Sequence, residues 1–423
     1  MIVEATGYPV PTPRPLRIAL VVTSKIWGGS ESQAALLAGE LRRQGHDCRF
    51  FARWGGRVAR AMRRDRFRVH AFVGTGRDPW SIWQMRRAFV RWRPDVLHLN
   101  DTHAISSGGL AAWRLPISAR VAMRRCVHPL RHVDRYLRFA DRVICVAAAV
   151  ADQCRLAGIG NDRLRIIHDG VAPERHGAPD HDIRRAVRRQ LSVGAAQPLL
   201  LTAAQLQPMK GHRYLVDAIH RLVPRYPNVV ALLAGAGPGR KALEQQIRQL
   251  GIGRNVRFVG FRHDVPRLLK AADLFVMPSL SEGLCSALIE AMAAGCPVVT
   301  TRVGGIAELV PAGEDRWPLA WAVPPHDPAS LTRAIGSALG APHDRAIRAE
   351  RARRRAIEYF TADRMVRQTL AVYHELLGQP ERSVEHCSNL ESEKCACPLR
   401  LPRCDSAFHG RGTGQASQAA SWS

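Results

Sequence analysis

Two glutamates stand out in a stretch that otherwise carries no charge. Residues 275–301 number 27, and Glu282 and Glu290 are their only charged side chains, in a chain where 23% of residues are charged. A carboxylate buried without a partner costs several kcal/mol, so we expect both to face a cleft or to accept hydrogen bonds. Ribose and sugar hydroxyls are suitable donors. The alternative is that the two residues, about two helical turns apart, lie on a solvated surface stripe.

The segment that carries these glutamates predicts a loop followed by a helix. Residues 281–283 read as the end of a loop, and residues 284–294 have helical spacing until Gly295 and Pro297 stop them. Because small residues crowd this helix, it can lie close to a sheet or to a ligand.

The rest of the chain alternates short apolar strands with helices, which predicts parallel sheets covered on both faces. The pattern of strand, glycine loop, helix and strand begins near residue 16 and restarts near residue 198. We therefore expect an α/β fold with two Rossmann-like, doubly wound domains facing across a cleft. Strands are expected at residues 16–22, 47–51, 96–99, 142–146, 164–167, 199–202 and 229–234.

The expected domain boundaries follow from this alternation. An N-terminal extension would cover residues 1–15, and a first domain residues 16–175. A second domain would cover residues 176–360, after a hinge at 171–182 that is rich in Pro, Gly and His. A helix at 361–378 would cross back to the first domain, and 379–423 would form a disordered tail.

The charge of the chain is unusual for its length. The 423 residues carry 62 Lys and Arg against 36 Asp and Glu, a net charge of +26, and only five of the 62 are Lys. Such a balance is typical of proteins that bind nucleic acid, anionic membranes or phosphorylated ligands. It can equally follow from the base composition of a genome.

No apolar run is long enough to span a membrane, and the run at residues 18–22 is too short for a signal peptide. We therefore expect a cytoplasmic protein, which could bind peripherally at the inner face of the cytoplasmic membrane. Six of the ten cysteines are scattered in apolar contexts, as buried free thiols would be. The other four crowd the tail, where zinc binding with its histidines is the alternative to disorder. These tail residues are Cys387, Cys395, Cys397, Cys404, His386 and His409.

The segment SEGLCSALIEAMAAGCPVVTTRVGGIAELV resembles the donor-site signature of glycosyltransferase family 4, whose members are retaining enzymes with the two-domain GT-B fold. The family's pattern is a Glu, seven residues, a second Glu, a Gly-Pro-Val-Val strand and a Gly-Gly loop. The resemblance covers about residues 16–378 and is strongest over 198–310. The matching residues are Glu282, Glu290, Gly295, Pro297, Val298, Val299, Gly304 and Gly305.

Three upstream segments extend the resemblance. LLAGAGPGR, with Gly235 and Gly237, resembles the family's Gly-x-Gly-Pro element. VRFVGFRHDVPRLLKAADLFVMPS, with Phe261 and Arg262, resembles the base-contacting strand and the strand before the signature. QLQPMKGHRYLVDAI resembles the segment that carries the phosphate-binding lysine, here Lys210.

The resemblance implies that the first domain, residues 16–175, holds the acceptor and that the second, residues 176–360, holds the donor. It also implies a role for each matched residue. Glu290 would bind the ribose hydroxyls of the nucleotide, and Glu282 would contact the transferred sugar as part of the catalytic machinery. The backbone N–H groups of Gly283 and Leu284 would lie near the diphosphate, as at other helix N-termini. Lys210 would neutralise the diphosphate as it leaves, because a fixed cation in a dry cleft stabilises developing negative charge.

One position departs from the family's pattern. The family usually has an Arg five residues before the lysine, and this sequence has Gln205. An amide can donate a hydrogen bond to phosphate but supplies no charge. Either Arg213, Arg240 or Arg262 replaces the missing cation, or donor binding is weak.

The first domain carries weaker signals. The segment Trp27-Gly28-Gly29-Ser30-Glu31 resembles the family's first glycine-rich loop, although an ordinary strand-to-helix turn would look the same.

The family often has an active-site His after the strand that matches residues 120–123. Arg125 stands at that place, His128 follows it, and His103 lies in another loop. His128 and His103 are therefore the candidate catalytic histidines, with a purely structural role as the alternative. A protein base is not required if the donor phosphate takes the proton of the acceptor.

We expect neither a metal nor another cofactor, since the nucleotide-diphosphate sugar would be a co-substrate. The only Asp-x-Asp sequence is at residues 180–182, in the hinge, where we interpret it as linker polarity.

Residues 42–95 hold 15 Arg against four Asp. Within them the helix PWSIWQMRRAFVRW interleaves aromatic residues with Arg. Such a helix either docks on an anionic membrane or turns its aromatics to the sheet.

The expected function is transfer of a sugar from a nucleotide-diphosphate donor to a cell-envelope glycan or glycolipid, of the lipopolysaccharide or exopolysaccharide type. One alternative is a nucleic-acid-associated basic protein, but no helix-turn-helix, zinc-finger or RNA-recognition motif supports specific nucleic-acid binding. Another is a GT-B protein that epimerises or hydrolyses a nucleotide sugar.

Overall fold

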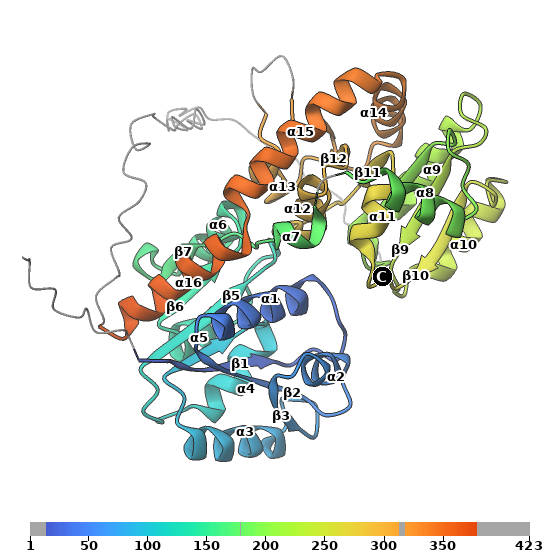
Figure 1. Cartoon of the computed structure of the whole chain (residues 1–423). Coiled ribbons are helices and arrows are strands. Elements are labelled where there is room, and N and C mark those ends of the chain that lie inside the picture. The colour runs from blue at the N-terminus through green and yellow to red at the C-terminus, as the bar shows by residue number, and fades with distance from the viewer. Residues whose placement is uncertain (1–13, 178, 313–317, 379–423) are drawn as a thin grey trace, which may run out of the picture. The chain divides into compact units, whose positions relative to one another are not determined.

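The protein contains two parallel β-sheets (Figure 1). The computed structural model describes residues 14–177, 179–312 and 318–378. The expected tail at 379–423, with its four cysteines and two histidines, lies outside the described residues. So does the expected extension except for residues 14 and 15. Of the six other cysteines, five are buried free thiols and Cys126 is half-buried.

The first sheet has seven strands in the order β3-β2-β1-β4-β5-β6-β7. All of its pairings are parallel, and helices connect successive strands, as parallel pairing requires. Its strands are β1 (Arg17–Val22), β2 (Asp47–Arg53), β3 (Arg68–Phe72), β4 (Val96–Leu99), β5 (Ala119–Arg124), β6 (Arg142–Cys145) and β7 (Leu164–Ile166). The connecting helices are α1 (Gly29–Arg43), α2 (Arg57–Arg64), α3 (Pro79–Trp92), α4 (Thr102–Ala111), α5 (Val133–Phe139), α6 (Ala148–Leu156) and the short η1 (Asn161–Arg163).

The second sheet has six strands in the order β10-β9-β8-β11-β12-β13, again all parallel. Its strands are β8 (Leu199–Ala203), β9 (Val230–Ala234), β10 (Val256–Gly260), β11 (Leu274–Met277), β12 (Val298–Thr301) and β13 (Trp321–Val323). Its helices are α8 (His181–Gln190), η2 (Pro208–Lys210), α9 (His212–Leu222), α10 (Arg240–Gln249), α11 (Val265–Ala271), α12 (Ser286–Ala293), α13 (Ile306–Leu309), α14 (Pro328–Gly340) and α15 (Pro342–Tyr359).

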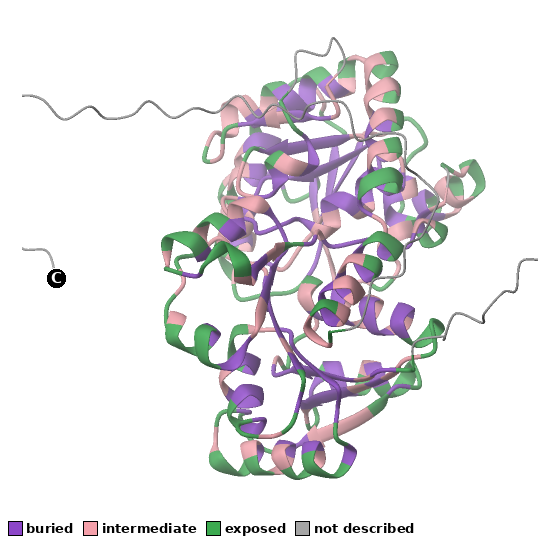
Figure 2. Cartoon of the chain, turned by 90° about the vertical axis from the view of Figure 1, so that its left-hand side faces the viewer, coloured by how far each residue is buried: buried purple, intermediate pink, exposed green. Residues whose placement is uncertain are grey.

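Both sheets reverse their strand order at the first strand, which confirms the doubly wound prediction. In the first sheet β1 lies between β2 and β4, and in the second β8 lies between β9 and β11. Ligands of such sheets bind outside the carboxyl ends of the strands at this reversal. The central strands are buried on both faces, as the purple arrows in Figure 2 show, which explains their continuous apolar runs.

The segment predicted to be a hinge contains structure of its own. It includes the short helix α7 (Pro173–His176) and the start of α8. The carboxylate of Asp180 accepts hydrogen bonds from the backbone N–H groups of Asp182 and Ile183, both at 2.9 Å. Asp180 is therefore the N-cap of α8, and the interpretation of residues 180–182 as linker polarity was wrong for this aspartate.

The C-terminal helix α16 (Ala362–Leu376) lies against α1 and β5 of the first sheet. A buried hydrogen bond fixes it there, because the Tyr373 hydroxyl lies 2.6 Å from Nδ1 of His98 on β4. Burial and the nearby charge of Arg125 lower the pKa of His98 to about 3, so the ring is neutral at physiological pH.

Replacing Tyr373 by Phe should destabilise the protein by about 1–3 kcal/mol, since it leaves the buried His98 ring without its partner. The matched control is Tyr214→Phe, because the Tyr214 hydroxyl makes a similar bond of 2.7 Å to His326 at the surface. That change should cost less than about 0.5 kcal/mol. Urea unfolding measures both, and equal losses would contradict this account of how α16 is held.

Candidate active site

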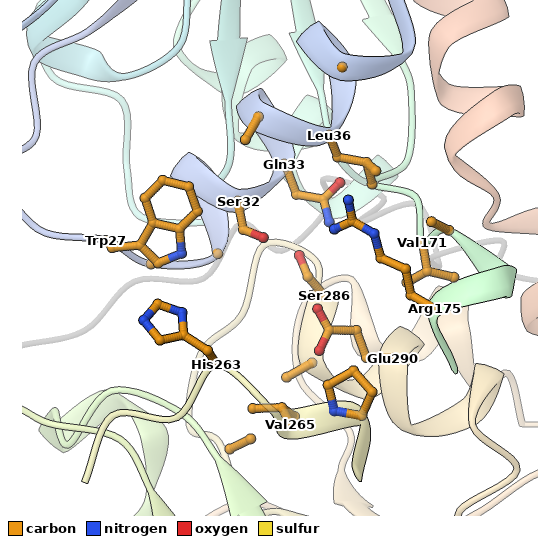
Figure 3. A pocket seen from close by; sticks show the side chains of 18 of the residues that line it. Trp27, Ser32, Gln33, Leu36, Val171, Arg175, His263, Val265, Ser286 and Glu290 are labelled. Atoms are coloured by element: carbon orange, nitrogen blue, oxygen red, sulfur yellow. The ribbon is translucent and has the colours of Figure 1, made fainter. Parts of the chain in front are cut away.

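A cavity of about 770 Å³ is lined by elements of both sheets. From the first side come the loop at Trp27–Gly29 and one face of α1, including Ser32 and Gln33 (Figure 3). The second sheet's domain contributes residues that follow strands β8, β9 and β10, together with residues of α12. The predicted donor residues among the lining are Gln205, Gly235, Phe261, Arg262 and Glu290.

Glu290 projects from α12 into this cavity (Figure 3). Its carboxylate accepts no hydrogen bond from any residue that the structure describes. Burial raises the pKa of Glu290 to about 7, although the nearby Arg175 opposes this shift. The side chain is thus a hydrogen-bond acceptor without a protein donor, on the wall of a cavity.

Lys210 and Glu282 form an ion pair beside the cavity rather than on its wall. The Lys210 Nζ lies 2.8 Å from Oε1 and 2.9 Å from Oε2 of Glu282, and the Ser279 hydroxyl donates to Oε1 at 2.7 Å. Glu282 is only 5% exposed, so it does not lie on a solvated stripe, and that alternative was wrong. Burial alone would lower the pKa of Lys210, but the Glu282 carboxylate raises it, so the ammonium stays charged.

Glu282 lies in the loop before α12, not on the helix with Glu290. The helix begins at Ser286, two residues later than the predicted start at Leu284. Among the described residues, no acceptor takes the backbone N–H of Gly283 or of Leu284. These donors therefore stand beside the Lys210 ammonium at the start of α12, where an anion would be stabilised.

The glycines of this loop are required by backbone packing. A Cβ on Gly283 would lie 2.1 Å from the carbonyl oxygen of Arg125, which follows β5 of the first sheet. Cβ atoms on Gly304 and Gly305 would lie 1.9 and 2.0 Å from the carbonyl oxygens of Glu282 and Gly283. The loop at Gly304 and Gly305 thus packs against the loop that carries Glu282. The Glu282 loop also packs against the residue that follows β5 of the first sheet.

Gln205 faces the glycine loop of the first sheet. Its Nε2 lies 2.8 Å from the position that a Cβ of Gly28 would occupy. The Gly28 N–H donates to Glu31 at 2.9 Å, and Gly29 is the first residue of α1. Gln205 therefore contacts the glycine loop through the end of a flexible side chain, a contact that an ordinary strand-to-helix turn can also make.

Gly235 and Gly237 allow their loop to pack closely against the backbone of residues 204–206. Cβ atoms there would lie 1.9 Å from the Ala204 carbonyl oxygen and 2.5 Å from that of Leu206. Gly235 lines the cavity, and Gly237 does not.

Only one of the three arginines proposed to replace the missing cation reaches the cavity. Arg262 lines it, with its guanidinium paired to Asp264 at 2.7 Å. Arg240 instead pairs with Glu244, and Arg213 stacks over the ring of Tyr214. Neither of these two lines the cavity.

The two candidate histidines are exposed, and neither lines the cavity. The His128 carbonyl accepts from Arg124 at 2.5 Å, and His103 contacts the guanidinium of Arg77. Burial and Arg77 lower the pKa of His103. Neither ring forms a hydrogen bond with Glu282 or Lys210, whose partners are each other and Ser279.

Several residues near the site were given no role from the sequence. Arg125, at the place of the family's histidine, pairs with the buried Asp169, which accepts from the Ser286 hydroxyl at 3.1 Å. This chain of contacts joins the first sheet to the start of α12. His212, two residues after Lys210, is buried, and neither of its ring nitrogens has a partner among the described residues. Burial lowers the pKa of His212 to about 4. Arg175 and Ser286 line the cavity.

Within residues 14–177, 179–312 and 318–378, no three His, Cys, Asp or Glu side chains are grouped so that they could hold a metal ion. Metal-free chemistry stays a prediction.

Two family models match the chain. "Glycosyltransferase Family 4" matches residues 27–175, and "Glycosyl transferases group 1" matches residues 183–355. The glycogen synthase of Mycobacterium tuberculosis is 30% identical over 307 residues, which cover 67% of this chain and 69% of the relative. The chain belongs to glycosyltransferase family 4. The nucleic-acid alternative is thereby set aside in favour of a glycosyltransferase enzyme.

Other relatives of this glycosyltransferase differ in what their names say they act on. The D-inositol 3-phosphate glycosyltransferase of Corynebacterium urealyticum is 29% identical, over 72% of this chain and 69% of the relative. The lipopolysaccharide core biosynthesis glycosyltransferase LpsE of Rhizobium meliloti is 30% identical, over 58% of this chain and 62% of the relative.

The fold of this glycosyltransferase is also that of solved relatives. HepE from Anabaena, in complex with UDP-glucose, superposes with a TM-score of 0.75 at 23% identity. The match covers 86% of this chain and 99% of the other. Together with the two parallel sheets, it confirms the predicted two-domain GT-B fold.

Replacing Lys210 by Met should destabilise the protein by about 3 kcal/mol, because it leaves the Glu282 carboxylate buried without its cation. Lys241→Met is the matched control, since Lys241 is exposed on α10. The double variant Lys210→Met, Glu282→Gln should recover more than half of the loss. Urea unfolding gives the three values. A cost for Lys210→Met as small as that of the control would contradict the importance of the ion pair.

Proposed function

We propose that the protein is a retaining glycosyltransferase that moves a sugar from a nucleotide-diphosphate donor to a cell-envelope glycan or glycolipid. The observation that carries this proposal is the grouping at the carboxyl end of the second sheet. There the unpartnered carboxylate of Glu290 lines the cavity, and the charged Lys210 and the free N–H groups of Gly283 and Leu284 belong to the ion pair and the loop beside it. A diphosphate needs the Lys210 cation and the N–H donors, and a ribose needs the carboxylate of Glu290 as a hydrogen-bond acceptor.

The donor would lie along the second-sheet wall. The base would pack against Phe261, which is 40% exposed, and the ribose hydroxyls would donate to Glu290. Gln205 and Gly235 would border the phosphates. HepE was solved with UDP-glucose, so a UDP-sugar is the first donor to test.

The ion pair would change partners during the reaction. When the diphosphate arrives, the Lys210 ammonium can turn to it, which frees the Glu282 carboxylate to accept hydrogen bonds from the sugar. The bond between the anomeric carbon and the phosphate oxygen breaks, and the acceptor oxygen bonds to that carbon on the same face. The acceptor proton passes to the departing phosphate oxygen. Lys210 and the loop N–H groups stabilise the charge that develops there, so we propose that no metal is needed.

The acceptor is proposed to belong to the cell envelope. The printed names of the relatives include a lipopolysaccharide core enzyme, an inositol-phosphate enzyme and a glycogen synthase. The basic first domain favours the envelope acceptor, because such molecules are assembled at anionic membranes.

Helix α3 supports the membrane part of this proposal. Its residues Met85, Phe89 and Trp92 are buried against the sheet, whereas Trp80 and Trp83 are 57% and 46% exposed. The two exposed rings stack at 4.7 Å, and the Arg87 guanidinium lies over Trp83 at 5.5 Å. The helix thus both packs inward and presents Trp and Arg to solvent. We propose that this face rests on the inner leaflet of the cytoplasmic membrane.

No helix among the described residues is long and apolar enough to cross a bilayer.

At least one of UDP-, GDP- and ADP-glucose should raise the melting temperature of the protein, and Glu290→Ala should abolish the shift. Glu350→Ala, an exposed change on α15, is the control. For the sugar that binds, affinity at pH 8 should exceed affinity at pH 6 by up to roughly tenfold, because a carboxyl with a pKa of about 7 gains its full acceptor character only above that pH. Glu290→Gln should remove this pH dependence.

Absence of binding by all three nucleotide sugars would contradict the donor site. Binding followed by release of free or epimerised sugar, without any dependence on an acceptor, would point to the hydrolase or epimerase alternative instead.

Replacing Trp80 and Trp83 together by Ser should reduce cosedimentation with vesicles of phosphatidylglycerol and phosphatidylethanolamine at least fivefold. The reason is that these rings are the exposed apolar part of the basic face. Leu156→Ser removes a side chain that is 81% exposed on α6 and should have no effect. Equal binding by both variants and the parent protein would contradict docking through α3.

A further inference from the structure

At the carboxyl edge of the first sheet, two arginines from separate elements lie near enough to His103, on a third element, to act on its charge. Arg77 belongs to the loop between β3 and α3, His103 to the first turn of α4, and Arg135 to α5. The Arg77 guanidinium contacts Nε2 of His103, and Arg135 bonds to the Ser106 hydroxyl at 2.9 Å, one turn along α4. We call these three residues the basic cluster.

Among the described residues, no carboxylate forms an ion pair with a side chain of the basic cluster. Asp101 acts on the charge of His103, but its oxygens are already occupied. They accept from the Thr23 N–H and hydroxyl at 2.7 and 2.6 Å and from the His103 and Ala104 N–H groups at 3.0 and 2.8 Å. Asp78 is likewise committed to Thr75 and Ser81. In the part of the chain that the structure describes, neither Arg77 nor Arg135 pairs with a carboxylate, and Asp134 beside Arg135 forms no ion pair.

The basic cluster lies where an acceptor would approach. The loops that supply Arg77 and His103 follow β3 and β4, and a Cβ on Gly76 would touch the side chain of Thr23 at 3.5 Å. The glycine loop that faces Gln205 follows Thr23 on the same edge. The cluster does not line the cavity assigned to the donor. It is therefore a separate feature at the first-sheet side.

We infer that the basic cluster binds an anionic group, a phosphate or a carboxylate, on the acceptor. The guanidinium groups of Arg77 and Arg135 are exposed and form no ion pair with a described carboxylate, so a bound anion would supply the opposite charge that they lack. The planar forks of Arg77 and Arg135 suit the paired oxygens of either group. His103 is then a binding residue rather than the catalytic base. This inference rests on the proposed function, since it names the acceptor class of that transferase.

Three probes test the inference in protein saturated with the nucleotide that the donor screen identifies. They are glucose 6-phosphate, glucuronate and glucose, with binding measured by titration calorimetry. At least one of the two anionic probes should bind at least tenfold more tightly than glucose. Tighter binding of glucose 6-phosphate would indicate a phosphate on the acceptor, and tighter binding of glucuronate a carboxylate. The double variant Arg77→Gln, Arg135→Gln should lower that preference to less than twofold.

Arg60→Gln is the control, because Arg60 is an exposed arginine on α2 outside the cluster. It should keep the preference, and all variants should keep the nucleotide affinity and melting temperature of the parent. Equal binding of charged and neutral sugars, no binding of the anionic probes, or an equal loss in Arg60→Gln would overturn the inference while nucleotide binding stands. Failure of the nucleotide itself to bind would instead refute the proposed function.

Discussion

The ion pair between Lys210 and Glu282 is the interaction on which the donor half depends. Two loops that follow different strands meet there, with both charges largely removed from solvent. The backbone has to come very close for this, since a Cβ on Gly211 would lie 1.8 Å from the Pro278 carbonyl oxygen. A buried pair of this kind adds little net stability, but removing one partner is costly. The pair thus keeps both groups charged and in place until a ligand exchanges with one of them.

Close backbone contact also joins this loop to the first sheet. Gly283 rests against the carbonyl of Arg125, whose guanidinium pairs with Asp169, and Asp169 in turn holds the Ser286 hydroxyl at the start of α12. The residue that replaces the family's usual histidine is therefore a structural link between the two sides of the site. Its role explains why an arginine is compatible with the fold at this position.

The fold was predictable because its signals are local. Buried parallel strands such as β1 and β8 are short apolar runs, and the glycine loops that follow them mark the carboxyl edge. Glu290 and Lys210 could be chosen because they are charged residues in segments of characteristic spacing. The contacts of Arg125, Asp169 and Arg175 could not be predicted, because they join segments far apart in the chain and none has a distinctive neighbourhood. The same holds for α3, where spacing alone did not tell which tryptophans face solvent.

Hydrogen exchange measured by mass spectrometry, with and without UDP-, GDP- and ADP-glucose, tests the central claim most directly. We expect the nucleotide sugar that binds to slow exchange in peptides covering residues 205–211, 234–237, 260–265 and 282–290, with exchange in the remaining peptides of the second domain unchanged. Slower exchange confined to other segments, or no change with any of the three, would contradict a donor site at this edge of the second sheet.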